Sequence, residues 1–253
     1  MSTINLEEIL HQVNVDCKDN GREFLVTDKL DAVAQLLADT PYQLKYTGPL
    51  SRIYSSAEYD GTPIVLLSVH TDDVYNVHFC KDLGTGLWQG TFDNNLSAAC
   101  VLHEMLCGQL APNVWVTFTG DEEVHSNGAA EVCGVLKENG IDVAQVIVTE
   151  VTHAGWQDQC AFVVENDRNM SLGKAWEMLG LLSEHRFAYL HEAEPDESEI
   201  YAGAGLSVLT LSIPVEGDMH SDEGCCVRHE LLPTYCEVLR NLVNLFAEIA
   251  EEE

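Results

Sequence analysis

Residues 116–124 read Val-Thr-Phe-Thr-Gly-Asp-Glu-Glu-Val and place three consecutive carboxylates after an apolar run. The run from Asn113 to Thr119 is rich in β-branched residues and predicts a buried strand. Three adjacent anions at the edge of a core repel one another unless a cation lies among them. A solvated acidic turn is the ordinary alternative in so acidic a chain. The cation-site interpretation therefore depends on finding further ligands elsewhere.

Such ligands follow three other predicted strands, and one more begins a predicted helix. They are His70 after strand 64–69, Glu150 after strand 143–149, His220 beyond strand 207–215, and Asp93 before the helix from residue 94 or 95. In an open α/β sheet, the carboxyl ends of parallel strands meet at one edge, where sites form. Two histidines and several carboxylates without thiolates suit zinc, and also cobalt or manganese.

The ligand set is large enough for two metal ions. Two dications about 4 Å apart need a carboxylate between them, and we expect Asp93 to be this bridge. His70 and Glu150 would complete one ion, and His220 and Glu123 the other.

Two further carboxylates would act without binding metal. Glu122 is adjacent to Glu123 but must point elsewhere, so we expect it to be the general base that takes a proton from the attacking water. Asp72 follows His70 by two residues and is expected to hold the other imidazole nitrogen. Singly, each residue has an ordinary explanation, such as a helix cap or a strand-end charge. The metal hypothesis rests on their joint occurrence.

Apolar strands alternate with amphipathic helices along the chain, which predicts a mostly parallel, mixed sheet covered on both faces. The length of 253 residues suits one domain spanning residues 1–253. Helices are expected at 3–14 behind a Ser/Thr cap, 27–39, 94–107, 128–138, 172–182 and 230–249. Strands are expected at 42–46, 52–54, 64–69, 113–119, 143–149, 160–164, 186–190 and 207–215, the last broken by Pro214.

The bulk composition excludes several classes of partner. With 42 acidic and 12 basic residues, the net charge is −30, which argues against binding nucleic acid or an anionic membrane. This charge fits a cationic ligand, such as a metal ion or a peptide amino terminus. The nine cysteines form no C-x-x-C pair, and the N-terminus has no signal-peptide pattern. We therefore expect free thiols in a cytoplasmic protein.

The segments around these residues resemble those of the co-catalytic di-zinc exopeptidases, in particular the bacterial leucyl and glutamyl aminopeptidase types. Five segments match in the family's order between residues 68 and 223. They are 68–72 with an H-x-D motif, 90–94 with the bridging Asp, 120–124 with the base and then a ligand, 148–154 with the strand-end carboxylate, and 217–223 with the final histidine.

The resemblance implies an α/β/α sandwich, two zinc ions, and removal of the N-terminal residue from peptides with Glu122 as the general base. It implies a peptide or amino-acid-derivative substrate. The large inserted domains of many relatives, which serve as a lid or in oligomerisation, have no room here. A self-assembling cage is therefore not expected, whereas a small homo-oligomer is compatible with the sequence.

Two positions depart from the family pattern and keep alternatives open. Glu150 stands where the glutamyl-type aminopeptidases usually have Asp, and Glu occurs there in related carboxypeptidases and deacylases. His125 stands where these families usually have glycine, close to the proposed base. The alternatives are a di-zinc carboxypeptidase or N-acyl amino acid deacylase, and a non-catalytic protein that binds metal or peptide.

Overall fold

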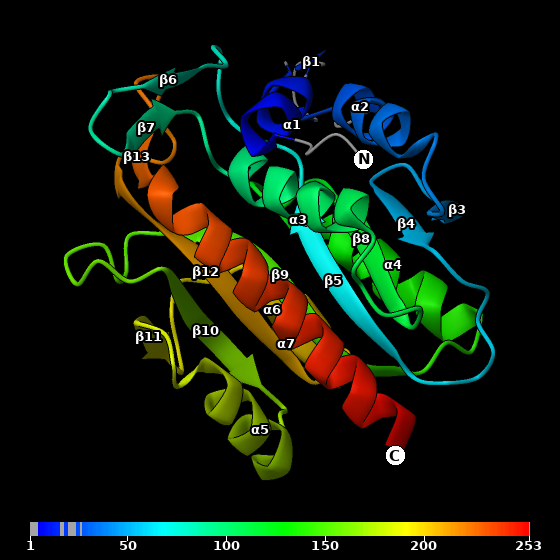
Figure 1. The fold of residues 1–253 in the computed structure, drawn as a ribbon. Helices are drawn as coiled ribbons and strands as arrows, with labels where there is room; N and C mark the ends of the chain where they lie inside the picture. Colours follow the sequence, from blue (N-terminus) through cyan, green and yellow to red (C-terminus); the bar gives the residue numbers. More distant parts are fainter. Residues whose placement is uncertain (1–4, 16–17, 20–23, 26, 253) are drawn as a thin grey trace.

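A mixed β-sheet runs through the middle of the molecule in the computed structural model, and helices cover both of its faces (Figure 1). The structure describes residues 5–15, 18–19, 24–25 and 27–252. The helices are α1 (Leu6–Val13), α2 (Thr27–Leu37), α3 (Asn95–Cys107), α4 (Asn127–Glu138), α5 (Leu172–Leu182), α6 (Ser198–Gly203) and α7 (Leu232–Glu252), with a 3-10 turn at His229–Leu231.

The main sheet has eleven strands, and a separate small sheet pairs β1 (Lys18–Asp19) with β2 (Phe24–Leu25). The strands of the main sheet are β3 (Gln43–Thr47), β4 (Ser51–Ser55), β5 (Ile64–His70), β6 (Cys80–Asp82), β7 (Leu87–Gly90), β8 (Val114–Thr119), β9 (Val143–Thr152), β10 (Phe162–Arg168), β11 (Phe187–Leu190), β12 (Val208–Gly217) and β13 (Cys225–Arg228).

Parallel pairing is confined to the centre of the sheet and to one edge. Strands β8, β5, β9 and β12 lie side by side in parallel, and β10 pairs in parallel with β11. The remaining pairs in the sheet are antiparallel, including β4 with β8 and β12 with β13. The predicted mixed α/β architecture is thus confirmed, but its parallel part is smaller than expected.

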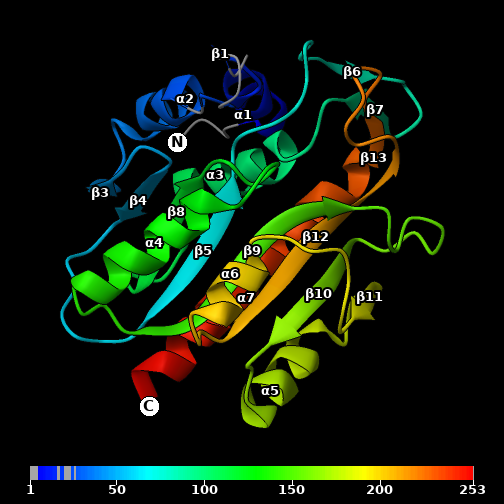
Figure 2. The ribbon, with the colours of Figure 1, turned by 180° about the vertical axis from the view of Figure 1, so that it is seen from behind.

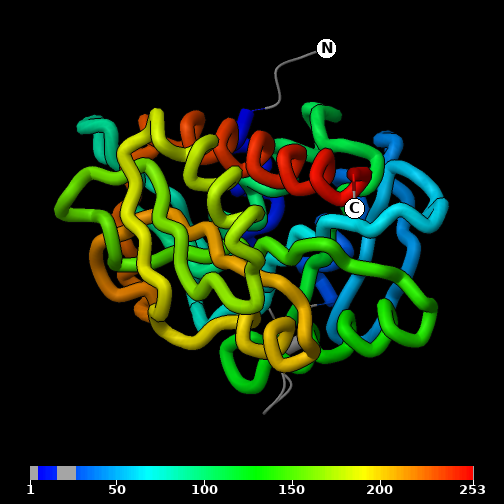
Figure 3. Tube along the Cα trace, turned by 90° about the horizontal axis from the view of Figure 1, so that it is seen from below, coloured from blue at the N-terminus to red at the C-terminus, as the bar shows by residue number. Residues whose placement is uncertain are grey.

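Two hydrophobic cores lie on opposite faces of the sheet. Every residue of β5 is buried, with Val65 and Leu67 facing one core and Ile64 and Leu66 the other. Helices α1, α3 and α7 pack over the first core, and α4 and α6 over the second (Figure 2). Seen from below, α7 follows one side of the sheet while α6 lies on the opposite side (Figure 3). Within the described residues no large inserted domain interrupts these three layers.

The ends of several elements differ from the sequence prediction. Strand β9 continues through Glu150 to Thr152 because its later residues still pair with β12. Strand β12 continues through Pro214 to Gly217, so Pro214 does not break it; beyond it, Val215 to Gly217 pair with β13. Helix α1 is capped by Asn5, whose side chain accepts a hydrogen bond from the Glu7 backbone N–H. The predicted start of this helix at residue 3 lies outside the described residues.

Helix α6 and strands β6, β7 and β13 were not predicted, because they are short and occur in segments expected to be loops. Among the described residues no helix is long and apolar enough to cross a membrane. The eight cysteines that the structure describes are all free thiols.

Candidate metal centre

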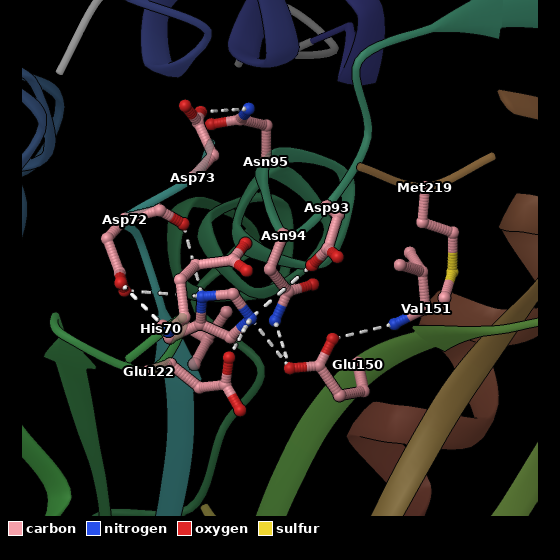
Figure 4. Close-up of polar contacts among 12 residues, drawn as sticks. His70, Asp72, Asp73, Asp93, Asn94, Asn95, Glu122, Glu150, Val151 and Met219 are labelled. Atoms are coloured by element: carbon pink, nitrogen blue, oxygen red, sulfur yellow. Dashed lines mark hydrogen bonds and ion pairs between the residues drawn. The ribbon is translucent and has the colours of Figure 1, made fainter. Parts of the chain in front are cut away.

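The side chains predicted to bind metal meet at one edge of the sheet. Figure 4 shows His70, Asp93 and Glu150 of this group. His70 is the last residue of β5, and Glu150 lies on the neighbouring strand β9. Asp93 directly precedes Asn94, the N-cap of α3, and the peptide bond between these two residues is cis. Glu123 follows β8, and His220 lies in the connection from β12 to β13. The parallel centre of the sheet therefore brings together residues from five separate segments.

One cluster forms around the His70 imidazole. Its Nε2 atom lies 2.7 Å from Glu150 Oε1 and 3.5 Å from Asp93 Oδ1. The ligand atoms of these three residues all lie within 4.8 Å of one another. One imidazole and two carboxylates at this spacing can hold one divalent cation.

A second cluster forms around His220. Its Nε2 atom lies 3.1 Å from Asp93 Oδ2 and 3.6 Å from Glu123 Oε2. Asp93 thus offers one carboxylate oxygen to each imidazole. This is the placement expected of a carboxylate shared by two ions.

Glu122 and Asp72 also lie at the centre. Glu122 Oε2 is 3.9 Å from His70 Nε2, and its side chain faces the same space from another side. The Asp72 carbonyl oxygen is 3.2 Å from His70 Nδ1, while its carboxylate oxygen Oδ1 is 3.4 Å away. The backbone carbonyl is therefore the nearer partner, and the Asp72 carboxylate accepts a hydrogen bond from the Glu123 N–H.

Two residues that received no individual role from the sequence hold the ligands in place. Asn94 donates hydrogen bonds from Nδ2 to Thr149 O and to Glu150 Oε1. The Tyr75 hydroxyl accepts a hydrogen bond from the Asp93 N–H and donates one to the Met219 carbonyl, next to His220. Tyr75 therefore joins the two segments that carry Asp93 and His220. Its partners are distant in sequence, so no local pattern indicates this role.

A buried polar network lies behind the centre. Lys29 of α2 pairs with the Asp73 carboxylate and donates a hydrogen bond to Asn95 Oδ1 at 2.6 Å. Asn95 in turn donates to Asp73 Oδ2, and His78 lies 3.0 Å from the same oxygen. The network ties α2 to the loop after β5 and to the first turn of α3. It thereby fixes the loop after β5 relative to the first turn of α3, which begins two residues after the proposed bridge Asp93.

The electrostatics of the centre call for additional positive charge. Burial raises the pKa of Glu150 well above its usual range, and burial followed by the nearby Asp93 raises the pKa of Glu123 to about 8. Burial alone would also raise the pKa of Asp93, but hydrogen bonds with His220 and His70 outweigh it and lower that pKa. Glu123 Oε1 is buried without a hydrogen-bond partner. These carboxylates fit metal ions, which would remove the repulsion among them.

The centre opens into a cavity of about 470 Å³. Among the described residues that line it there is neither lysine nor arginine. Besides the carboxylates already described, its wall contains Glu165, Glu194 and Asp196. The cavity therefore favours a ligand with a positive charge.

Comparison with known proteins supports the fold at a distance. No protein-family model and no curated protein sequence matches this chain. Among solved structures, a TET aminopeptidase from a marine sediment Thaumarchaeota archaeon aligns with a TM-score of 0.77 at 12% identity, over 98% of this chain and 100% of that chain. The chain has the fold of this aminopeptidase.

Two further structures show that this fold occurs under more than one activity name. The TET1 peptidase of Pyrococcus horikoshii, which can assemble into a tetrahedron or a large octahedral shell, aligns with a TM-score of 0.69 at 11% identity, over 94% of this chain and 99% of that chain. A structure described as an endoglucanase from Thermotoga maritima aligns with a TM-score of 0.66 at 13% identity, over 95% and 99%. At such identities the likeness establishes the fold, and the activity must be argued from the site.

Proposed function

We propose that this protein is a metal-dependent aminopeptidase that removes the N-terminal residue of peptides. The observation that carries the proposal is the pair of histidine–carboxylate clusters that share Asp93 beside an acidic cavity. The fold shared with the TET aminopeptidases supports it. A glycosidase would need two carboxylates but no histidines spaced as ligands, so the site favours the peptidase over the endoglucanase name.

The proposed ligands are His70, Asp93 and Glu150 for one zinc ion and Asp93, Glu123 and His220 for the other, with cobalt or manganese as substitutes. When bound, such ions supply an activated water and polarise the scissile carbonyl. Asp72 and Asn94 contribute by fixing the orientation of these ligands.

Glu122 is the proposed general base. Its side chain faces the space between the clusters, and its carboxylate approaches His70 Nε2 at 3.9 Å without direct hydrogen-bond contact. It is therefore free to take a proton from the attacking water and to deliver that proton to the leaving amine.

The charge of the cavity separates an aminopeptidase from the alternatives. A carboxypeptidase or an N-acyl amino acid deacylase must bind a substrate carboxylate, for which arginine or lysine is the usual partner. The described lining of the cavity offers no such cation and offers Glu165, Glu194 and Asp196 instead. These groups suit the α-ammonium group of a peptide.

A substrate panel tests this proposal. Zinc-loaded protein is given one peptide in three forms, with both termini free, with the N-terminus acetylated, and with the C-terminus amidated, with and without a chelator. We expect N-terminal residues to be released from the free and amidated forms only, and the chelator to abolish release. Release of a C-terminal residue from the acetylated peptide would show a carboxypeptidase instead, and no release from any form would contradict catalysis.

We further propose a cytoplasmic homo-oligomer. The free thiols fit a reducing compartment.

Leu172 and Trp176, one turn apart on α5, are 90% and 76% exposed, which is unusual for apolar side chains outside an interface. Light scattering of the wild-type protein and of Trp176→Glu tests the oligomer. We expect a smaller particle for the variant, and a wild-type monomer would refute the proposal.

A further inference from the structure

One acidic group of the cavity wall, Glu165, is built into the sheet beside the candidate centre. Strands β9, β12 and β10 lie side by side in this order (Figure 2), and Ser212 of β12 is the register partner of Glu150 on β9. Glu165 of β10 accepts a hydrogen bond from the Ser212 hydroxyl at Oε2 and one from the Thr152 hydroxyl at Oε1. Hydroxyl groups from two strands therefore hold this carboxylate in one place on the cavity wall.

The Glu165 carboxylate is buried beside other acids and without a cation. The residue is 6% exposed, and among the described residues that line the cavity there is neither lysine nor arginine. Burial raises the pKa of Glu165 and the hydrogen bonds from Ser212 and Thr152 oppose this shift, whereas Asp196 and Glu194 add to it. Buried ionised groups are normally paired with an opposite charge. A cation that enters the cavity would supply that charge.

The position of Glu165 suits the end of a substrate side chain. The α-ammonium nitrogen of a peptide is two bonds from the scissile carbonyl carbon, so it stays within about 2.5 Å of that carbon at the centre. Glu165 is farther away, because its carboxylate lies one strand spacing and one hydrogen bond from Glu150, on the order of 8 Å. An extended lysine side chain spans about 6 Å from Cα to Nζ. Its ammonium group therefore reaches Glu165 while the α-ammonium group remains at the centre.

We propose that Glu165 binds the cationic side chain of the first residue of the substrate, so that the preferred substrates are peptides that begin with lysine or arginine. This inference rests on the proposed function and names its substrate class. Asp196 and Glu194 add negative charge around the bound cation. Leu190 and Ala193 also line the cavity and offer apolar surface to the carbon stem of the side chain.

Other first residues fit this wall less well. An apolar side chain would exclude water from the Glu165 carboxylate without replacing it by a charge or a hydrogen-bond donor. An acidic side chain would be repelled by Glu165, Asp196 and Glu194 together. The wall therefore discriminates by charge at the end of the side chain.

A matched pair of substrates tests the inference. Zinc-loaded protein is given fluorogenic amides of lysine, arginine, norleucine and glutamate; norleucine has the four-carbon stem of lysine without its charge. We expect kcat/KM for the lysyl and arginyl amides to exceed that for the norleucyl amide by about 10- to 100-fold, with the glutamyl amide the poorest. Cleavage of the norleucyl amide as fast as the lysyl amide would overturn the inference but leave the proposed function standing. No cleavage of any amide would contradict both.

The variant Glu165→Gln assigns the preference to this residue. Glutamine keeps the size of the side chain and can still hydrogen-bond to Ser212 and Thr152, but it carries no charge. We expect the ratio of lysyl to norleucyl kcat/KM to fall about tenfold or more. The matched control Glu192→Gln removes an exposed charge from the loop that carries Asp196 and should keep the wild-type ratio. A wild-type ratio in Glu165→Gln would overturn the inference.

Salt separates direct contact from attraction at long range. In about 1 M salt the Debye length is about 3 Å, so distant charges no longer influence the substrate, whereas a pair inside the cavity is screened less. We expect the wild-type protein to keep most of its preference for the lysyl amide under this condition. Loss of the preference in salt would overturn contact with Glu165. The wild-type measurements remain decisive even if Glu165→Gln does not fold.

Discussion

Asp93 differs from the other proposed ligands because both imidazoles contact it, at 3.5 Å for His70 and 3.1 Å for His220. Loss of a shared carboxylate should disturb both ions, whereas loss of a terminal ligand should disturb one. We therefore expect Asp93→Ala to lose both zinc ions of the centre and His220→Ala to lose one.

Mass spectrometry of protein dialysed against metal-free buffer measures this difference. Equal losses in Asp93→Ala and His220→Ala would contradict a shared ligand. Substitution of His11, an exposed histidine of α1, is the control and should leave the count unchanged.

Glu122 is the residue whose substitution should separate metal binding from turnover. Glu122→Gln keeps the size and the polarity of the side chain but cannot accept the proton. We expect kcat to fall by about 10²–10⁴ with the metal content unchanged. Steady-state kinetics with parallel metal analysis measures both quantities, with the exposed Glu184→Gln as control. A Glu122→Gln enzyme with wild-type kcat would exclude Glu122 as the base.

At the residue scale, the sequence predicted the residues that gather at the centre and the neighbouring Asp72, but not the other residues that support them. His70, Asp93, Glu123, Glu150 and His220 could be found because each stands at or near the end of an apolar strand or at a helix start. Their roles as ligands stay predictions. Lys29 looks in the sequence like an ordinary surface lysine of an amphipathic helix, yet it is buried against Asp73. Such long-range pairs leave no local signal.

The buried pair of Lys29 and Asp73 acts at the scale of whole elements, because it joins α2 to the loop after β5. Burial alone would raise the pKa of Asp73, but His78, Lys29 and Asn95 outweigh it and lower the pKa to about 2. In an unfolded chain the Asp side chain has a pKa of about 3.9. The folded state therefore gains stability above about pH 4 and loses it as the pH falls toward about 2, by about 2–3 kcal/mol in total.

Urea unfolding of metal-stripped protein at about pH 5 and about pH 2 measures this contribution. We expect Asp73→Asn to lose less stability across this range than the wild-type protein, because its side chain does not titrate. The exposed Asp158→Asn should behave like the wild type. An equal pH dependence in Asp73→Asn and wild type would show that the pair contributes nothing.

At the element scale, the long apolar strands and periodic helices were predicted within a few residues, because burial on both faces leaves a continuous apolar run. The extension of β9 past Glu150 was missed, since polar residues at a strand end look like a loop until their partner strand is known. The same reason hides β7 and β13, which pair with each other across a long sequence separation. Tertiary pairing decides where these strands end.

The charge of the whole molecule should influence which peptides reach the centre. A net charge of −30 and an acidic cavity attract cationic peptides over distances comparable with the Debye length. We expect kcat/KM for a lysine-rich peptide to fall about tenfold between low and physiological salt. A neutral peptide of equal length should change little, which makes it the control in the same assay. A lysine-rich peptide whose kcat/KM does not depend on salt would contradict electrostatic attraction.

The shared position of Asp93 also has a consequence for protein synthesis. Its first imidazole partner and the bridge itself leave the ribosome before the segment that carries His220 and the Met219 carbonyl, which Tyr75 contacts. On the proposed function, a nascent chain that lacks this last segment holds only one half of the centre. The hydrolytic activity would then arise only once the sheet has received β12 and β13.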